Sequence, residues 1–142
     1  MKIVFSNDVE NKEFLGRGLD NFNRVFNNNI IAFKDKKEFG FYIYKEGKII
    51  GGVCGSSDMG NWIEVELLYI DQDYRANDLG TKLIDKVEKY AKENNHLGIH
   101  LKTWSWQAKG FYEKMGFTKF GELTNHPKDG TMYYMKKELR QA

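Results

Sequence analysis

Apolar residues recur with the spacing of an amphipathic helix in three stretches of the chain. Residues 11–27 place them on one helical face, which ends at a run of asparagines. Residues 79–94 repeat the pattern, and residues 107–115 form a shorter stretch that Gly116 ends, as a C-terminal glycine commonly does. The apolar positions are Phe14, Leu15, Leu19, Phe22, Val25 and Phe26 in the first stretch and Leu79, Leu83, Ile84, Val87 and Ala91 in the second.

Strand-like runs surround these helices. Residues 3–5 form a short first strand, and residues 39–45 alternate Phe and Ile with Tyr. A turn at Glu46 and Gly47 predicts a hairpin with a second strand over 48–54, followed by a loop over 56–60. The remaining strands are predicted over 62–70, 99–104, 117–123 and 132–136.

The predicted order is β-α-β-β-β-α-β-α-β-β in a single domain over residues 1–142. The strand at 62–70, the following helix and the strand at 99–104 form a βαβ unit, which requires a parallel strand pair. The other strands are joined by hairpins and are antiparallel. We therefore expect an α+β (mixed α/β) fold with a central twisted mixed sheet of six to seven strands and helices on both faces.

Composition narrows the class of protein. The 142 residues carry a net charge of +2, which gives no general case for nucleic acid as partner. Cys54 is the only cysteine, so an internal disulfide is excluded. The first residues are too polar for a signal peptide, and no apolar run has the ~20 residues that span a bilayer. We expect a soluble cytoplasmic protein that does not bind membranes.

The segment between the strand at 62–70 and the next helix is typical of an anion site. It reads Tyr74-Arg75-Ala76-Asn77-Asp78-Leu79-Gly80-Thr81-Lys82-Leu83. The first N–H groups of a helix have no partner within the helix, and the helix dipole favours negative charge beside them. Phosphate-bearing cofactors are the usual occupants of such turns.

Two motifs resemble those of the GNAT superfamily of acyl-CoA-dependent N-acetyltransferases, in particular its small bacterial single-domain members. Residues 75–80 resemble the cofactor motif Arg/Gln-x-x-Gly-x-Gly/Ala at a helix start. Residues 107–117, Gln-Ala-Lys-Gly-Phe-Tyr-Glu-Lys-Met-Gly-Phe, resemble the segment Ala-x-x-Phe-Tyr-x-x-x-Gly-Phe. Both occur in the family's order, and the predicted element order also matches the family along the whole chain.

The chain departs from the family at two positions. Asp78 replaces the middle glycine, which normally lets the backbone approach the pyrophosphate. Its carboxylate either repels phosphate or caps the helix, and we favour the cap; Lys82, four residues on, could also neutralise it. Gln107 replaces the usual asparagine before the second motif.

The resemblance implies transfer of acetyl from acetyl-CoA to a primary amine by direct attack in a ternary complex, without a metal. An alkyl amine has a pKa of ~10.4 and arrives mostly protonated, so a general base is useful. Glu64 and Glu66 lie two apart on one strand and project from one face; we prefer Glu66, although both could be ordinary exposed residues. Tyr112 matches the family's acid for the leaving thiolate, or else it only packs.

The resemblance also implies a cofactor site. Backbone groups of the strand at 62–70 would bind the pantetheine arm and polarise the thioester. The segment at 75–82 would hold the phosphates, and the second motif would line the other side of the slot. The residues implied are Leu68, Tyr69, Ile70, Arg75, Ala76, Asn77, Asp78, Leu79, Gly80, Thr81, Lys82, Gln107, Phe111 and Tyr112.

Several residues carry weaker signals. Aromatic residues at Trp104, Trp106, Trp62, Tyr42 and Tyr44 either form an acceptor pocket or pack in the core. The three histidines (His96, His100 and His126) lack the spacing of metal ligands. No base is identifiable beside Cys54, which argues against a nucleophile.

Three functions stay open at this stage. We favour acetylation of a small-molecule amine, because no additional domain is predicted that would dock a protein. A module that binds acyl-CoA without turnover is the second reading. Acetylation of a peptide or of a charged tRNA is the third, which lysines at 34, 36, 37, 136 and 137 suggest. Many relatives pair through edge strands, so a homodimer is also open.

Overall fold

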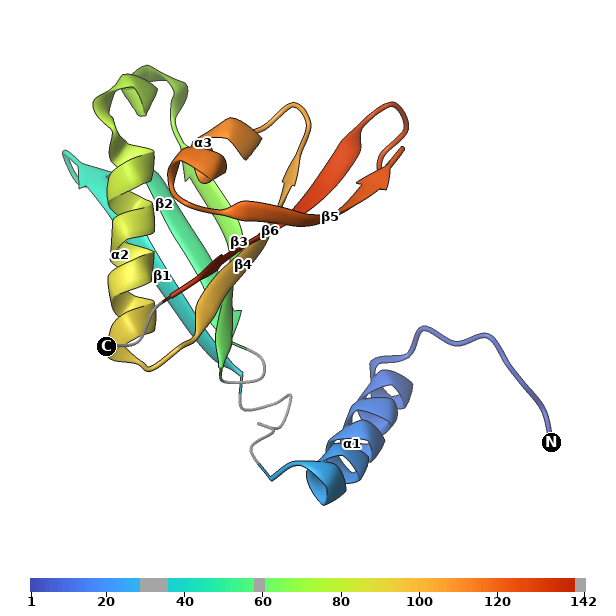
Figure 1. Ribbon diagram of the computed structural model, residues 1–142. Helices are drawn as coiled ribbons and strands as arrows, with labels where there is room; N and C mark the ends of the chain where they lie inside the picture. The colour runs from blue at the N-terminus through green and yellow to red at the C-terminus, as the bar shows by residue number, and fades with distance from the viewer. Residues whose placement is uncertain (29–35, 58–60, 140–142) are drawn as a thin grey trace.

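The computed structural model describes residues 1–28, 36–57 and 61–139, and it contains one six-stranded sheet (Figure 1). The strands lie in the order β1-β2-β3-β4-β6-β5, and only β3 and β4 run parallel. This confirms the predicted mixed sheet with its βαβ unit. The strands are β1 (Lys37–Lys45), β2 (Lys48–Ser57), β3 (Trp62–Ile70), β4 (Gly98–Trp104), β5 (Thr118–Thr124) and β6 (Thr131–Glu138).

The helices also fall close to their predicted positions. They are α1 (Val9–Phe26), the 3-10 helix η2 (Gln72–Asn77), α2 (Leu79–Glu93) and α3 (Lys109–Lys114). Gly116 follows α3 with a φ of 94°, which a residue with a side chain rarely adopts. The hairpin turn between β1 and β2 has positive φ at both Glu46 and Gly47, as a type I′ turn requires.

The two parallel strands separate along their length. Their pairing runs from Trp62 opposite Gly98 to Val65 opposite Leu101 and then stops. β3 continues to Ile70 and β4 to Trp104, so the carboxyl ends of the two strands diverge. Backbone groups of β3 that point toward β4 beyond Val65 therefore have no strand partner.

One face of the sheet, which we call the packed face, carries the core. Leu83, Ile84, Val87 and Ala91 of α2 are buried against it, as their periodicity predicts. Tyr112 of α3 belongs to the same cluster, so α2 and α3 lie on the same face (Figure 1). The sheet residues of the cluster include Val53, Ile63, Val65, Ile99, Leu101 and Met135.

The opposite face, which we call the open face, differs from the prediction of helices on both sides. α1 has the expected apolar stripe, yet it has no buried residue and stands away from the sheet (Figure 1). The predicted strand over 3–5 is wrong, because residues 1–8 form no strand. A strand needs a neighbouring backbone to pair with, and none of the strands that the structure describes lies beside residues 3–5.

Two further boundaries differ from the prediction. β2 extends to Ser57, because Ser56 pairs with Glu64 and is buried, so residues 56 and 57 belong to the sheet rather than to a loop. Residues 58–60 of that predicted loop lie outside the described residues. The predicted turn before α2 is largely the 3-10 helix η2, whose last residue is followed by Asp78.

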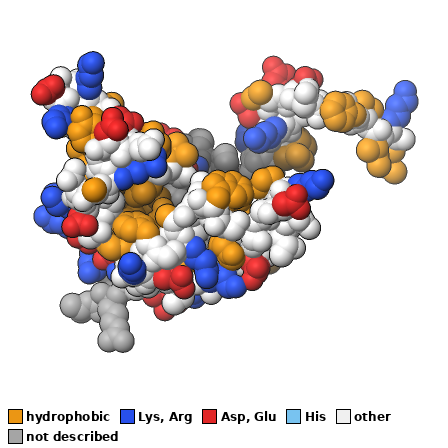
Figure 2. Space-filling view, turned by 90° about the horizontal axis from the view of Figure 1, so that it is seen from above, with side chains coloured by type: hydrophobic (Ala, Val, Ile, Leu, Met, Phe, Trp, Pro, Cys, Tyr) orange, Lys and Arg blue, Asp and Glu red, His pale blue; other side chains and the backbone are white. Residues whose placement is uncertain are grey.

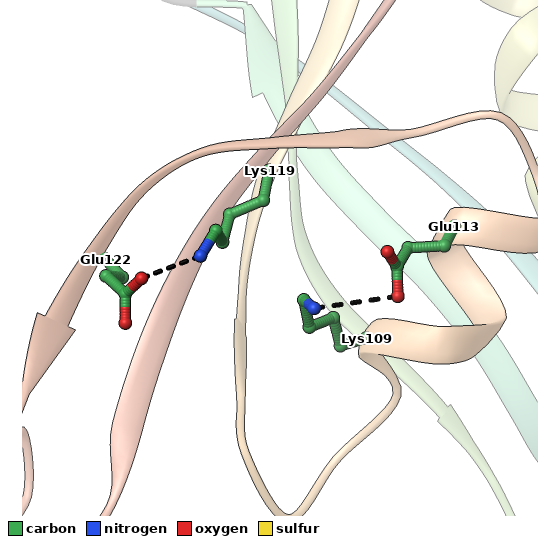
Figure 3. Close-up of polar contacts among 4 residues, drawn as sticks. All are labelled: Lys109, Glu113, Lys119 and Glu122. Carbon is green, nitrogen blue, oxygen red and sulfur yellow. Dashed lines mark hydrogen bonds and ion pairs between the residues drawn. The ribbon is translucent and has the colours of Figure 1, made fainter.

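Charged residues surround Tyr133 beside α3. Lys109 forms an ion pair with Glu113 at 3.7 Å, and Lys119 forms one with Glu122 at 2.7 Å (Figure 3). Both ammonium groups also lie over the Tyr133 ring, at 5.2 and 5.6 Å from its centre. The hydrogen bond to Glu122 raises the pKa of Lys119. These contacts connect α3 to the β5–β6 hairpin at the surface.

Among the described residues, no helix is both long and apolar enough to cross a membrane. The cytoplasmic location stays a prediction.

Candidate active site

A cavity of about 810 Å³ opens on the packed face where β3 and β4 diverge. β3, the start of α2, the end of β4 and α3 all contribute to its wall. Most residues expected at a cofactor site line it: Leu68, Tyr69, Ile70, Arg75, Asp78, Gly80, Thr81, Gln107, Phe111 and Tyr112. Sequence positions far apart thus meet in one cavity.

The amino end of α2 points its unbonded N–H groups to the cavity edge. The first bond of the helix is donated by the N–H of Lys82 to the carbonyl of Asp78, at 3.1 Å. The N–H groups before it have no side-chain cap, and the first turn holds no acidic residue. Gly80 lies here without a side chain, and a Cβ would lie 3.3 Å from the Phe111 ring. This end of α2 can accept an anion.

The remaining residues of the motif lie apart from the cavity wall. Ala76 and Asn77 are part of η2, and Leu79 packs against the core. Lys82 is on the exposed side of the first turn of α2. Arg75 does line the cavity, and its Nε donates a 2.8 Å hydrogen bond to the carbonyl of Ile70, which holds its guanidinium beside the end of β3.

Asp78 does not act as the side-chain cap that the sequence suggested. It precedes α2 with φ 54° and ψ 25°, and its side chain makes no cap hydrogen bond. The described ion pairs also do not join it to Lys82. Its backbone is left-handed, a conformation in which glycine is free and Asp is tolerated. The glycine that the family has at this position therefore suits the left-handed backbone found here.

The two candidate bases are not equivalent. Cys54 pairs with Leu67 and Gly55 with Val65, so Glu66 is the extra residue of a β-bulge. Glu66 lines the cavity and Glu64 does not. The Oγ of Ser56 donates a 2.5 Å hydrogen bond to the Oε1 of Glu66, and the Nζ of Lys36 lies 3.5 Å from the same oxygen.

Tyr112 lies against the cavity and inside the core. Its side chain is 6% exposed, and its ring contacts those of Phe111 and Phe117. Burial raises the pKa of Tyr112 to about 12, so its phenol keeps its proton at neutral pH. A protonated phenol is therefore available at the cavity as a donor.

Two of the five candidate pocket aromatics reach the cavity. Trp104 and Trp106 line it, with ring centres 6.3 Å apart, and the Nε1 of Trp104 donates to the carbonyl of His126 at 2.7 Å. Trp62 is excluded, because it lies at the other end of β3, beside Gly98. Tyr42 and Tyr44 are exposed on β1, away from the cavity.

The sequence did not single out Lys102 and Thr103, which also line the cavity. Gln107 explains part of the local architecture, because its Oε1 accepts hydrogen bonds from the N–H of Trp104 at 3.0 Å and the Oγ1 of Thr103 at 3.4 Å. It thus closes the turn from β4 into α3. For Lys102 and Thr103, the only signal in the sequence was their position near the carboxyl end of a strand beside the βαβ crossover.

Within the described residues, no three His, Cys, Asp or Glu side chains are grouped as a metal site. The absence of a metal stays a prediction.

Comparison with known proteins gives the same family as the two motifs. The profile of the acetyltransferase (GNAT) family matches residues 7–117. Blasticidin-S acetyltransferase of Streptomyces morookaense is 32% identical over 96 residues, which cover 67% of this chain and 70% of that protein.

Two crystal structures extend the likeness to three dimensions. An acetyltransferase from Bacillus cereus ATCC 14579 superposes with a TM-score of 0.86 at 26% identity, over 98% of this chain and 99% of that one. A Bacillus anthracis structure assigned to the streptothricin acetyltransferases, in complex with acetyl coenzyme A, has a TM-score of 0.65 at 27% identity. That match covers 72% of this chain and 62% of the other. The chain belongs to the acetyltransferase (GNAT) family and is an acetyl-CoA-dependent N-acetyltransferase.

Proposed function

We propose that this chain, as a single domain over residues 1–142, transfers acetyl from acetyl-CoA to a primary amine of a small molecule by direct attack in a ternary complex. The observation that carries the proposal is the cavity at the divergence of β3 and β4. It combines an uncapped helix end, a carboxylate and a protonated phenol in one cavity. These are the groups that the transfer of acetyl to an amine requires.

Acetyl-CoA supplies the thioester, and residues of one side of the cavity would hold it. The N–H groups of Gly80 and Thr81 and the guanidinium of Arg75 provide positive charge for the pyrophosphate. The unpaired edge of β3 at Leu68, Tyr69 and Ile70 offers N–H and C=O groups to the amide-bearing arm. An N–H from the same edge can stabilise negative charge that develops on the thioester oxygen.

We assign the roles of base and hydrogen-bond donor to Glu66 and Tyr112. Glu66 accepts a proton from the acceptor ammonium, directly or through water, and the freed nitrogen attacks the acetyl carbon. A C–N bond forms and the C–S bond breaks, while the Tyr112 phenol donates a hydrogen bond to the leaving sulfur. The second proton that the nitrogen loses as it becomes an amide passes through water to the thiolate. Because the pKa of Tyr112 is raised to about 12, full transfer to a thiolate of pKa ~8.5 is uphill, and the phenol acts mainly as a hydrogen-bond donor while the C–S bond breaks.

The acceptor end of the cavity favours a small amine. Trp104 and Trp106 give it an aromatic wall, which can attract an ammonium group through the ring face. Blasticidin-S acetyltransferase, the relative above, is named for a small-molecule acceptor. We also propose that the protein acts in the cytoplasm, where acetyl-CoA is made.

Surface charge gives little support to a tRNA or protein acceptor. Three of the lysines that suggested it form ion pairs: Lys36 with Glu66, Lys136 with Glu138 and Lys137 with Glu88. Lys34 lies outside the described residues. Paired lysines offer fewer free charges to phosphates.

The test is release of free thiol from acetyl-CoA with a panel of amines that includes blasticidin S, streptothricin, polyamines, aminoglycosides and peptides. We expect turnover above background with at least one small amine, and an acetylated product in mass spectrometry. Turnover with peptides alone would contradict a small-molecule acceptor. Background release throughout, from protein shown by calorimetry to bind acetyl-CoA, would contradict the proposed acceptor class entirely.

A further inference from the structure

The N-terminal segment, residues 1–28, exposes an apolar surface that no other described residue of its own chain covers. Every apolar side chain of the α1 stripe is more than 60% exposed: Phe14, Leu15, Leu19, Phe22, Val25 and Phe26. Ile3, Val4 and Phe5 are exposed as well. Figure 2 shows this segment projecting from the rest of the molecule with hydrophobic side chains on its surface. Surfaces of this kind are rare on soluble monomers.

α1 is a helix that needs tertiary contacts. It has 18 residues, two of them glycines at Gly16 and Gly18, which lower its intrinsic helix propensity. Helices near this length are marginal in water even with favourable sequences, and packing of an apolar face normally supplies their stability. The apolar stripe of α1 therefore calls for a partner surface.

The surface area that a partner would have to cover is large. The chain exposes 10,785 Å², whereas a compact monomer of 16.6 kDa exposes about 7,600 Å². The excess of roughly 3,000 Å² per chain is well above the ~800 Å² that each partner buries in a standard protein–protein interface. An interface that buries this much area per chain is typical of intertwined partners.

The open face of the sheet offers the matching surface. Tyr42, Tyr44, Ile49, Leu67 and Tyr69 are all more than half exposed on it. Between them lies a hollow of about 320 Å³, whose wall includes Gly51, Gly52 and the half-buried Cys54. α1 is ~27 Å long and β1 is ~30 Å long, so the helix can cover most of the length of the strand.

The edge of the sheet offers a second contact. β1 is an outer strand, and within the described residues its free edge pairs with no other strand. Every second residue of this nine-residue strand turns its N–H and C=O groups to the free edge, and these unpaired groups invite another strand. Residues 3–5 have the apolar, β-branched character of a strand and pair with none of the described strands of their own chain. The edge and the segment are thus complementary.

The placement of α1 points to a second copy as the partner. The match to the Bacillus cereus structure covers 98% of this chain with a TM-score of 0.86. The N-terminal segment is about a fifth of the chain. A superposition that left a fifth of the chain unmatched would score lower, and this supports the same projecting position for the segment of that crystal structure. When every copy projects its segment and leaves its open face bare, the two surfaces can meet between copies.

We propose that two copies of this chain exchange their N-terminal segments. α1 of each copy lies on the open face of the other, and residues 3–5 of each pair with the outer edge of β1 of the other. The contact is reciprocal, so two copies satisfy both segments and no further copies are added. Leu67 and Tyr69 line both the hollow and the active-site cavity, so the exchanged helix lies against a strand of the acceptor site.

The first test measures the mass of the full chain by light scattering during size-exclusion chromatography. We expect about twice 16.6 kDa at micromolar concentration. The double variant Leu19→Gln, Phe22→Gln should raise the dissociation constant of the dimer at least ~100-fold, because two buried apolar contacts are lost. The matched control Glu13→Gln, Arg17→Gln places the same two amides on the polar side of α1 and should stay dimeric. A monomeric wild type, or equal dissociation of both variants, would overturn the exchange.

The second test separates exchange from docking of α1 on its own chain, and it does not depend on weakening the fold. An isotope-labelled chain carrying L19C and C54S is refolded together with the unlabelled wild type, whose only thiol is Cys54. Each chain then has one thiol, and a short bismaleimide is added. We expect a covalent product that peptide mapping assigns to position 19 of the labelled chain and Cys54 of the other. The single variant L19C, which keeps Cys54, is treated in the same way. The proposal would be contradicted if L19C formed only a link within one chain and the mixture of labelled and unlabelled chains gave no covalent product between the two.

Discussion

The two faces of the sheet use similar apolar content in different ways. On the packed face, Ile63 and Leu101 of the sheet are buried in one cluster with Ile84 of α2. On the open face, Tyr44, Leu67 and Tyr69 remain exposed although α1 carries an apolar stripe of its own. β3 belongs to both faces, and the cavity forms where its pairing with β4 ends.

One chain therefore completes its core and its active-site cavity by itself, whereas its open face is left for a second copy to cover. The core and the cavity are built from residues 36–139, so the groups for catalysis come from one copy. The open face offers no catalytic group to the cavity apart from the strand that both faces share. We therefore expect substitutions on the packed face to change folding or chemistry, and substitutions on the open face to change association.

The largest effect is expected for Ile84→Ala on α2. Ile84 has no exposed surface, so its truncation should cost 2–5 kcal/mol, an order-of-magnitude range for buried aliphatic residues. Ile49→Ala on the open face is the comparison, and within one chain it should cost less than about 1 kcal/mol because Ile49 is 56% exposed. Urea denaturation of both variants measures the difference.

Protein concentration sharpens this comparison. A loss at Ile49 that grows with concentration indicates that a second copy covers the residue. The loss at Ile84 should be nearly the same at every concentration. Equal losses at the two positions in dilute protein would contradict the distinction between the faces.

Glu66→Gln should give the next largest effect. Loss of a general base typically lowers the rate ~10²- to 10⁴-fold, so kcat/KM for the amine should fall by at least ~100-fold. Glu64→Gln is the matched control, because Glu64 lies two residues away and does not line the cavity. The defect at Glu66 should shrink as pH approaches the amine pKa of ~10.4, where the substrate needs no base. A defect independent of pH would indicate a purely structural role for Glu66.

Tyr112→Phe tests the buried phenol in both chemistry and stability. Loss of the donor should lower kcat by ~10- to 100-fold with little change in the KM for acetyl-CoA. The pKa of Tyr112 is raised to about 12 in the folded state against ~10 unfolded, so the unfolded chain loses this proton first. The wild type should then lose up to roughly 3 kcal/mol of stability between pH 10 and 12, and none of it below pH 10.

The Tyr112→Phe variant should not show this loss of stability at alkaline pH. Tyr44→Phe, on the open face, removes an exposed phenol and should keep the loss seen in the wild type. Chemical denaturation at several pH values measures it. An alkaline loss that persists in Tyr112→Phe would assign it to another group.

The sequence predicted the parts of the fold that local pattern determines. The stripe from Leu79 to Ala91 located α2 on its correct face, and Gly116 marked the end of α3. The two motifs brought Gly80 and Tyr112 into one cavity, although they lie some thirty positions apart. Periodicity and motif spacing are encoded by residues that are near one another in the chain.

Features that depend on distant backbone were missed. The bulge at Glu66 arises from the register between β2 and β3, which no local pattern encodes. The predicted strand over 3–5 is wrong because no strand in the described part of the chain pairs with these residues. The stripe of α1 predicted a helix correctly but could not tell which surface it covers. Lys102 and Thr103 reach the cavity only because β4 diverges from β3.

The smallest effect is expected at Asp78, on the edge of the packed face where α2 begins. Its left-handed backbone costs ~1–2 kcal/mol in a residue with a side chain, and glycine avoids this cost but loses ~0.5–1 kcal/mol through its freer unfolded state. Asp78→Gly should therefore gain at most ~1.5 kcal/mol, instead of losing the stability that a helix cap would have provided. Removing the carboxylate from the uncapped end of α2 should also tighten acetyl-CoA binding by ~2- to 10-fold.

Asp78→Asn separates the two causes. Asparagine tolerates the left-handed backbone and carries no charge, so it keeps the conformation and removes only the repulsion. Calorimetry with acetyl-CoA should show Asn and Gly tightening binding equally if charge is the cause, whereas tightening by Gly alone would assign the effect to the backbone. Weaker binding in both variants would mean that the carboxylate assists the cofactor, which would reverse our interpretation of this edge of the site. Because Asp78 belongs to the packed face, neither variant should change the mass of the dimer, and that measurement keeps the chemistry of one face distinct from the association of the other.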